Sequence, residues 1–138
     1  MTGRGKTVLV VDDEEALRTL TAKLIESRGY NVLTAPSGAA ALETLAGSVK
    51  VDLIVLDVMM PGLSGLEALQ EIRSRGNDDV RVVLLTAQTK DEDVLGGYQM
   101  GADYYVTKPL QPSVLLNIID YLIGDLAPDE RARIEPLL

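Results

Sequence analysis

Five short apolar runs alternate with helix-like segments along the chain, and this alternation constrains the fold more than any other feature of the sequence. The runs lie at residues 7–11, 31–35, 53–57, 81–86 and 104–107. Those at 7–11 and 53–57 have almost no alternating polar positions, which is typical of parallel strands buried on both faces. Strict alternation of strands and helices predicts an α/β fold, with a doubly wound parallel sheet of five strands and helices on both faces.

The segments between the runs have apolar residues at helical spacing, together with start and stop signals. Helices are expected at about residues 14–28, 37–47, 66–75, from 89 onward, and at 112–123. Ser37 can cap the second helix, and Thr89 begins a capping-box pattern at the fourth. Residues 1–124 should therefore form one domain. Residues 125–138 are expected to be a C-terminal tail, either a linker or a short helix at about 129–134.

The composition narrows the possible functions. The chain has 138 residues, 46% of them apolar, which is enough for the core of one domain. It has no cysteine and no histidine, so disulfides, thiolate metal sites and Ser-His or Cys-His catalysis are excluded. A net charge of −8 disfavours binding to nucleic acid or an anionic membrane. No apolar stretch reaches the length of a membrane span and no signal peptide is evident, so a cytoplasmic location is expected.

Acidic residues follow two of the buried strands. Asp12 and Asp13 come directly after the first run, and Asp57 ends the third. Ligands of open α/β sheets bind beyond the carboxyl ends of the strands, where Thr86 and Lys108 are also expected. Three carboxylates brought together cannot all stay ionised at pH 7 without a cation. Hard oxygen ligands suit Mg²⁺, which binds through one or two carboxylates plus phosphate.

Each of these residues also has a plainer interpretation when it is taken alone. Asp13, which precedes two glutamates, could be only a helix N-cap, and Asp57 could be a turn residue. Thr86 could be a strand-end hydroxyl, and a lysine such as Lys108 is most often a solvated surface charge. The combination at one sheet edge favours a site that holds a metal and a phosphoryl group.

Taken together, these residues resemble the receiver domain of bacterial response regulators. The resemblance extends over about residues 6–123 and is carried by Asp12-Asp13, Asp57, Met60-Pro61-Gly62, Thr86-Ala87 and Lys108-Pro109. It implies a flavodoxin-like, CheY-like fold with strand order 2-1-3-4-5 and five helices. It also implies that Asp57 accepts a phosphoryl group in the presence of Mg²⁺. Because this chain has no histidine, the donor would be a separate histidine kinase or phosphotransfer protein.

The resemblance assigns roles to the residues around the acceptor. The Mg²⁺ ligands would be the side chains of Asp12, Asp13 and Asp57 and the backbone carbonyl of Met59. Lys108 and the hydroxyl of Thr86 would contact phosphoryl oxygens. Residues that shape the backbone would be Pro61, Gly62, Gly65 and Pro109, with a cis peptide between Lys108 and Pro109.

Three further residues are expected to govern switching and the lifetime of the phosphate. Tyr105 matches the switch aromatic of the family, which would move between exposed and buried positions. Alternatively, Tyr105 is an ordinary half-buried strand tyrosine. Met59 and Gln88 occupy the positions that tune dephosphorylation. Met59 has no group that could orient a water molecule, so slow hydrolysis is expected.

The helix expected at 112–123 is unusually apolar, with Asn117 and Asp120 as nearly all of its polar face. This pattern predicts an exposed apolar patch on the fourth and fifth helices, which would serve a homodimer or a downstream protein partner. Lysine and arginine are absent from 109–123, so the charge-paired dimer of many DNA-binding response regulators is not expected. Direct contact with nucleic acid or a membrane is not expected either.

Three classes of function remain to be compared. The favoured class is a phosphorylation-dependent signalling switch, which is not an enzyme beyond catalysing its own phosphorylation and dephosphorylation. The second is a phosphate-independent scaffold, which is disfavoured because the full acid set and the lysine are present. The third is a Mg²⁺-dependent aspartyl-phosphate hydrolase. Such enzymes typically need a second acid two residues after the nucleophile, where this chain has Met59.

Overall fold

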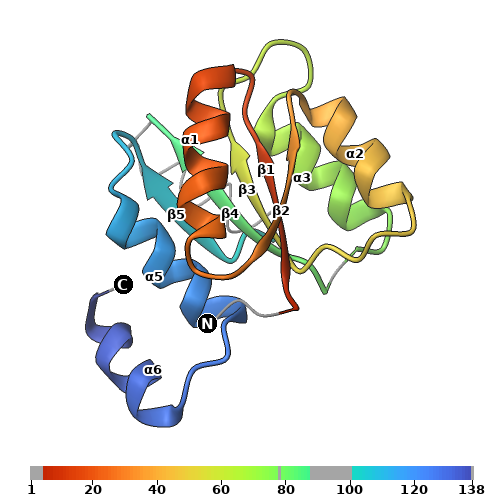
Figure 1. Cartoon of the computed structure of the whole chain (residues 1–138). Helices are drawn as coiled ribbons and strands as arrows, with labels where there is room; N and C mark the ends of the chain where they lie inside the picture. The colour runs from red at the N-terminus through yellow and green to blue at the C-terminus, as the bar shows by residue number, and fades with distance from the viewer. Residues whose placement is uncertain (1–4, 78, 88–100, 138) are drawn as a thin grey trace.

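The computed structural model describes residues 5–77, 79–87 and 101–137 and shows a single parallel sheet (Figure 1). Its strands are β1 (Thr7–Val11), β2 (Asn31–Ala35), β3 (Leu53–Asp57), β4 (Arg81–Thr86) and β5 (Tyr104–Thr107). They pair in the order β2-β1-β3-β4-β5. The predicted fold class, the strand bounds and the strand order implied by the resemblance are confirmed.

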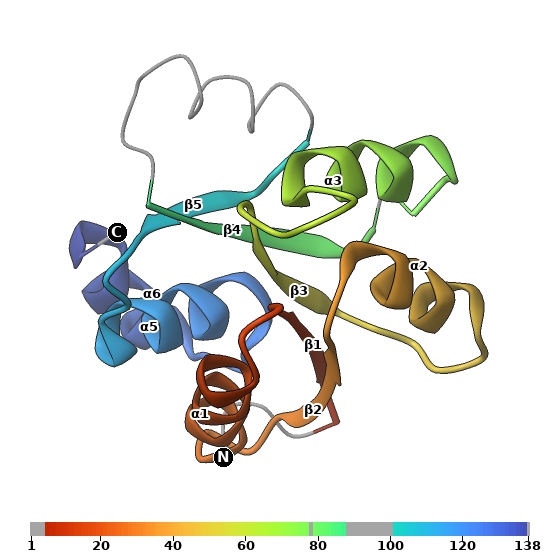
Figure 2. The same cartoon turned by 90° about the horizontal axis from the view of Figure 1, so that it is seen from above.

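Helices cover both faces of the sheet. They are α1 (Glu15–Glu26), α2 (Gly38–Ala46), α3 (Gly65–Ser74) and α5 (Pro112–Ile123), followed by α6 (Pro128–Ile134) and the 3₁₀ turn η1 (Glu135–Leu137). In Figure 2, α2 and α3 lie on one face, and α1 and α5 lie on the other with α6 beside α5. The sheet is buried between two apolar clusters, one under each helical layer. The fourth helix predicted from residue 89 lies outside the described residues.

Local capping explains where several of the helices begin and end. The Ser37 hydroxyl accepts a hydrogen bond from the Ala40 N–H at 3.1 Å, as the sequence predicts. Ser64 and Glu67 form a capping box, which starts α3 at Gly65, one residue earlier than expected. The helix α1 ends at Glu26, before the predicted position 28, because the chain turns into Gly29 at a positive φ of 92°.

The register of the strands brings the site residues to one edge of the sheet. Val11 pairs with Leu56 across β1 and β3, so Asp12 and Asp57 follow adjacent positions. Asp57 in turn pairs with Leu85 on β4. Thr86 pairs with Thr107 across β4 and β5, which places Lys108 directly after that pair. The carboxyl ends of four strands therefore meet at the upper edge of the sheet in Figure 1.

The helix α5 is packed more deeply than its sequence suggests, and the prediction made for Asp120 is wrong. Asp120 was expected on a polar outer face, yet it is 2% exposed and accepts hydrogen bonds from Arg28 and Tyr30. The apolar patch predicted for the fourth and fifth helices includes residues outside the described part of the chain. Among the large apolar side chains of α5, Val114 is exposed, at 36%. The others are buried or half-buried.

Another sequence prediction concerned residues 125–138. The short helix expected at about 129–134 is present as α6, beginning one residue earlier at Pro128. Arg131 lies over the ring of Tyr121 at 4.4 Å and donates to the Tyr121 carbonyl at 2.8 Å, so α6 packs against the end of α5. Within the described ranges, none of the helices combines the length and apolar composition needed to cross a membrane.

Candidate functional site

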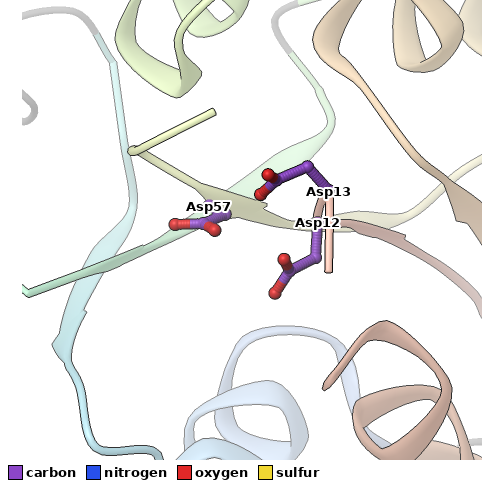
Figure 3. Close-up of side chains that lie close together, drawn as sticks. All are labelled: Asp12, Asp13 and Asp57. Atoms are coloured by element: carbon purple, nitrogen blue, oxygen red, sulfur yellow. The ribbon is translucent and has the colours of Figure 1, made fainter. Parts of the chain in front are cut away.

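Three carboxylates meet where β1 and β3 end. One oxygen from each of Asp12, Asp13 and Asp57 lies within 4.8 Å of the others. Figure 3 shows these side chains arriving from the two neighbouring strand ends. Asp12 and Asp57 are each 2% exposed, whereas Asp13 is exposed. The predicted convergence of the acids at one sheet edge is therefore what the structure shows, and Asp13 keeps the cluster open to solvent.

Asp12 is held in this cluster by backbone hydrogen bonds. Its N–H donates to the Ala35 carbonyl at 3.2 Å, and its carboxylate accepts from the Glu14 N–H at 3.0 Å. Burial raises the pKa of Asp12 above its ordinary value, and the negative charges of Asp57 and Asp13 raise it further. The hydrogen bond from Glu14 and the charge of Lys108 oppose that rise in pKa without cancelling it. The ionised form of Asp12 is therefore only partly compensated by the protein alone.

Asp57 has donors on both of its oxygens. The Lys108 ammonium lies 3.2 Å from Oδ2, and the Met59 N–H donates to Oδ1 at 3.2 Å. The Lys108 N–H donates to the Thr86 carbonyl at 2.7 Å, and the Lys108–Pro109 peptide is cis, as the resemblance implies. One ammonium thus faces three carboxylates, which leaves two negative charges in excess when all are ionised. This donor set of three carboxylates fits a hard divalent cation.

Glycine shapes the loop that follows Asp57. A side chain at Gly65 would place its Cβ 2.2 Å from the Asp57 carbonyl oxygen, so only glycine allows α3 to begin this close to β3. The Gly65 N–H donates to the Val58 carbonyl at 2.9 Å. Gly62 has a φ of 74°, and the neighbouring Pro61 is exposed. Backbone shaping is thus observed for Gly65 and Gly62.

Of the residues predicted to govern switching and phosphate lifetime, those that the structure describes lie around the same edge. Thr86 is fully buried, and Tyr105 is half-buried against the apolar cluster under α2 and α3. Met59 is 60% exposed, beside the acceptor carboxylate, whereas Met60 is buried. Gln88 lies outside the described residues. A cavity of about 290 Å³ lies between β5 and α5, and its lining includes Tyr105 and Lys108 from the β5 side and Val114 from α5.

Sequence reasoning missed one residue at the rim of the cluster. The Arg18 Nη1 donates to the Asp12 carbonyl at 2.8 Å, from the second turn of α1. The available signal was the position of Arg18, because helical side chains point back toward the N-terminus and so toward the strand end. Nothing in its residue type distinguished Arg18 from a surface charge.

The fold and the acid cluster together define a class: an open, doubly wound α/β domain with acids and a lysine at the carboxyl ends of its strands. A sequence profile of the response regulator receiver domain matches residues 8–120. The chain belongs to the response regulator receiver domain family, as its motifs indicate.

Individual relatives agree with this assignment. The transcriptional regulatory protein YvrH of Bacillus subtilis is 45% identical over 107 residues, which are 77% of this chain and 44% of YvrH. AfsQ1 of Streptomyces coelicolor, also named a transcriptional regulatory protein, is 42% identical over 109 residues, 79% of this chain and 47% of AfsQ1. The chain spans about half the length of the curated relatives it matches. The chemotaxis protein CheY4 of Vibrio cholerae has a TM-score of 0.79 at 30% identity, covering 85% of this chain and 98% of CheY4.

Proposed function

We propose that this protein is a phosphorylation-dependent signalling switch in which Asp57 is the phosphoacceptor. The observation that carries the proposal is the position of the Asp57 carboxylate, within 4.8 Å of carboxylate oxygens from two further acids and 3.2 Å from the Lys108 ammonium. A carboxylate can act as a nucleophile toward phosphorus when charge repulsion is offset by cations. The receiver domain would comprise residues 1–124, and residues 125–138 would form a tail after it.

The acid cluster would bind Mg²⁺. Asp13 and Asp57 would be direct ligands, Asp12 a direct or water-mediated ligand, and the Met59 carbonyl a further one. When bound, Mg²⁺ would neutralise charge between the carboxylate and the incoming phosphoryl group. The fit rests on the chemistry of the donors, which are all hard oxygens, and on the excess negative charge that Lys108 leaves uncompensated.

The chain's own residues would perform the transfer as follows. An oxygen of the Asp57 carboxylate forms a bond to phosphorus while the phosphorus–nitrogen bond of a donor phosphohistidine breaks. The electron pair stays on the departing imidazole nitrogen, which then takes a proton. Lys108 holds one phosphoryl oxygen by its ammonium group, and the Thr86 hydroxyl donates to a second. The donor would be a histidine kinase or a phosphotransfer protein, because this chain has no histidine.

Phosphorylation would change the conformation of the surface formed by β5 and α5. Movement of Thr86 toward the phosphate would free space for Tyr105, which lines the cavity shared with Lys108 and Val114. A homodimer or a downstream protein would bind this surface in the phosphorylated state. Met59 would leave the acyl phosphate without a side chain that orients water, so hydrolysis would be slow.

The decisive experiment is incubation with acetyl phosphate and Mg²⁺, followed by intact mass measurement. The wild type should gain one phosphoryl group, and Asp57→Asn should gain none. Asp125→Asn is the matched control, because it removes an exposed carboxylate outside the cluster. Continuous turnover of acetyl phosphate with no lasting adduct would instead indicate a hydrolase. Absence of both adduct and turnover in the wild type would indicate the phosphate-independent scaffold.

A further inference from the structure

Arg18 reaches from α1 to the acid cluster through a backbone contact. Its own N–H donates to the Glu14 carbonyl at 2.9 Å, which places it in the second turn of the helix. Its guanidinium folds back over the first turn, and Nη1 donates to the Asp12 carbonyl at 2.8 Å. Arg18 is half-buried, so this contact is made at the rim of the site and not in bulk solvent.

The carbonyl that Arg18 contacts belongs to the peptide joining Asp12 to Asp13. The N–H of Asp12 is held by Ala35 on β2, and its carboxylate is held by the Glu14 N–H. The bond from Arg18 adds a third tether at the carbonyl. Because a peptide unit is planar, holding this oxygen also sets the direction in which the chain continues to Asp13. The Asp13 carboxylate is the exposed member of the cluster and has the most freedom to turn away.

We propose that Arg18 is a positioning residue of the cation site. It holds the Asp12–Asp13 peptide so that the Asp13 carboxylate stays with those of Asp12 and Asp57 before the ion arrives. The inference rests on the proposed function, in which these acids bind Mg²⁺. Arg18 touches neither the ion nor the phosphoryl group in this role, and it acts through the backbone alone.

The positive charge of Arg18 and its positioning role predict opposite changes in Mg²⁺ affinity when Arg18 is replaced. A guanidinium close to a divalent cation repels it, so loss of the charge alone would tighten Mg²⁺ binding. Loss of the tether would let Asp13 leave the cluster, which weakens binding. Groups that orient metal ligands typically contribute about 10–100-fold in metal affinity. The sign of the change in Mg²⁺ affinity therefore shows which of the two effects is larger.

The test is a Mg²⁺ titration of the full chain at about 0.15 M ionic strength. The change in amide chemical shifts in NMR spectra measures the Mg²⁺ affinity. Arg18→Met, which keeps a long side chain without charge or donor, should weaken Mg²⁺ binding about tenfold. Arg18→Lys keeps a charge and a donor and should recover most of the affinity. Lys23→Met removes one exposed positive charge from the same helix, away from the strand end, and should bind like the wild type.

A second measurement distinguishes positioning from general damage. Phosphorylation of Arg18→Met by acetyl phosphate should be slow at low Mg²⁺ and return to the wild-type rate when Mg²⁺ is saturating. Unchanged or tighter Mg²⁺ binding in Arg18→Met would overturn the inference and leave the proposed function standing. If Arg18→Met does not fold, Arg18→Gln is judged by the same criterion. A wild type that binds no Mg²⁺ would overturn the proposed function, and the role of Arg18 with it.

Discussion

Two buried aspartates in this molecule have the same exposure and opposite surroundings. Asp57 and Asp120 are each 2% exposed, and each lies against a cation. Asp57 is beside Lys108 at 3.2 Å and shares its site with two further carboxylates. Asp120 pairs with Arg28 and also accepts a hydrogen bond from the Tyr30 hydroxyl at 2.6 Å. The first cluster has negative charge in excess, and the second is balanced.

This difference in charge balance distinguishes a candidate binding site at Asp57 from a structural ion pair at Asp120. The Asp120 cluster joins the turn between α1 and β2 to the buried face of α5, so its balanced charges stabilise the packing of α5 against that turn. The space beside it is filled, because a Cβ at Gly124 would lie 3.0 Å from the Tyr30 hydroxyl. The Asp57 cluster would need a divalent cation from solution to reach a similar balance. Burial of a carboxylate indicates little about function until the surrounding charges are counted.

The largest expected effect is the complete loss of phosphoryl acceptance in Asp57→Asn. The amide keeps the shape of the side chain and removes both the nucleophile and one of the crowded negative charges, so the fold should be retained. Intact mass after incubation with acetyl phosphate measures the first property, and thermal unfolding measures the second. A phosphoryl adduct on Asp57→Asn would show that another residue is the acceptor and that Asp57 does not differ from Asp120 in function.

The next largest effect is expected for Asp120→Ala. Removing one member of a buried ion pair leaves its partner without compensation, which typically costs about 3–5 kcal/mol. Arg28 is partly exposed, so we expect a loss of about 2–3 kcal/mol in the free energy of unfolding. Urea unfolding checks this value. The folded fraction should still accept a phosphoryl group on Asp57, and a selective loss of that property would contradict a purely structural role.

A smaller effect is expected for Tyr30→Phe, which removes one hydrogen bond to Asp120 and keeps the buried ring. The cost should be about 1 kcal/mol in the free energy of unfolding. The control is Tyr121→Phe, whose hydroxyl donates to Glu135 at an exposed position and should contribute less. If both substitutions lower the free energy of unfolding equally, the buried hydrogen bond from Tyr30 to Asp120 contributes no more than the exposed one from Tyr121.

The smallest effect concerns the pH dependence of the metal-free protein. Because burial raises the pKa of Asp12, the folded state keeps a proton on this carboxyl where the unfolded chain has lost it. The contribution of Asp12 to stability is therefore present below the ordinary value of 3.8 and is lost as the pH rises through the raised pKa. Unfolding of the wild type and Asp12→Asn in a chelator, compared across pH, isolates this change. A difference between them that does not vary with pH would show that Asp12 is not strained by its neighbours.

Much of the fold could be read from local patterns. The bounds of β1 to β5 were predicted correctly. For β1 and β3 the reason is that strands buried on both faces appear as continuous apolar runs. The position of the acids followed from a rule of topology, since the carboxyl ends of parallel strands share one edge. The strand order itself came from the resemblance to a known family, because apolar periodicity does not say which strands pair.

Asp120 could not be understood in the same way. Its helical position suggested an outward polar face, but its partners Arg28 and Tyr30 are 92 and 90 residues away in sequence. The role of Arg18 was missed for a similar reason, because its acceptor is a backbone carbonyl, which no residue pattern identifies.

The sequence by itself determined the alternating α/β architecture, the strand limits and the three acids with one lysine at the strand ends. Those features depend on the order of residue types along the chain and on general rules of chain geometry. Only the tertiary structure decided that the carboxylates come within 4.8 Å of one another and that Lys108 contacts Asp57. It also decided that Asp120 is buried and paired. The reason is physical: the electrostatic state of a carboxylate depends on distances to groups that the fold brings together from remote parts of the chain.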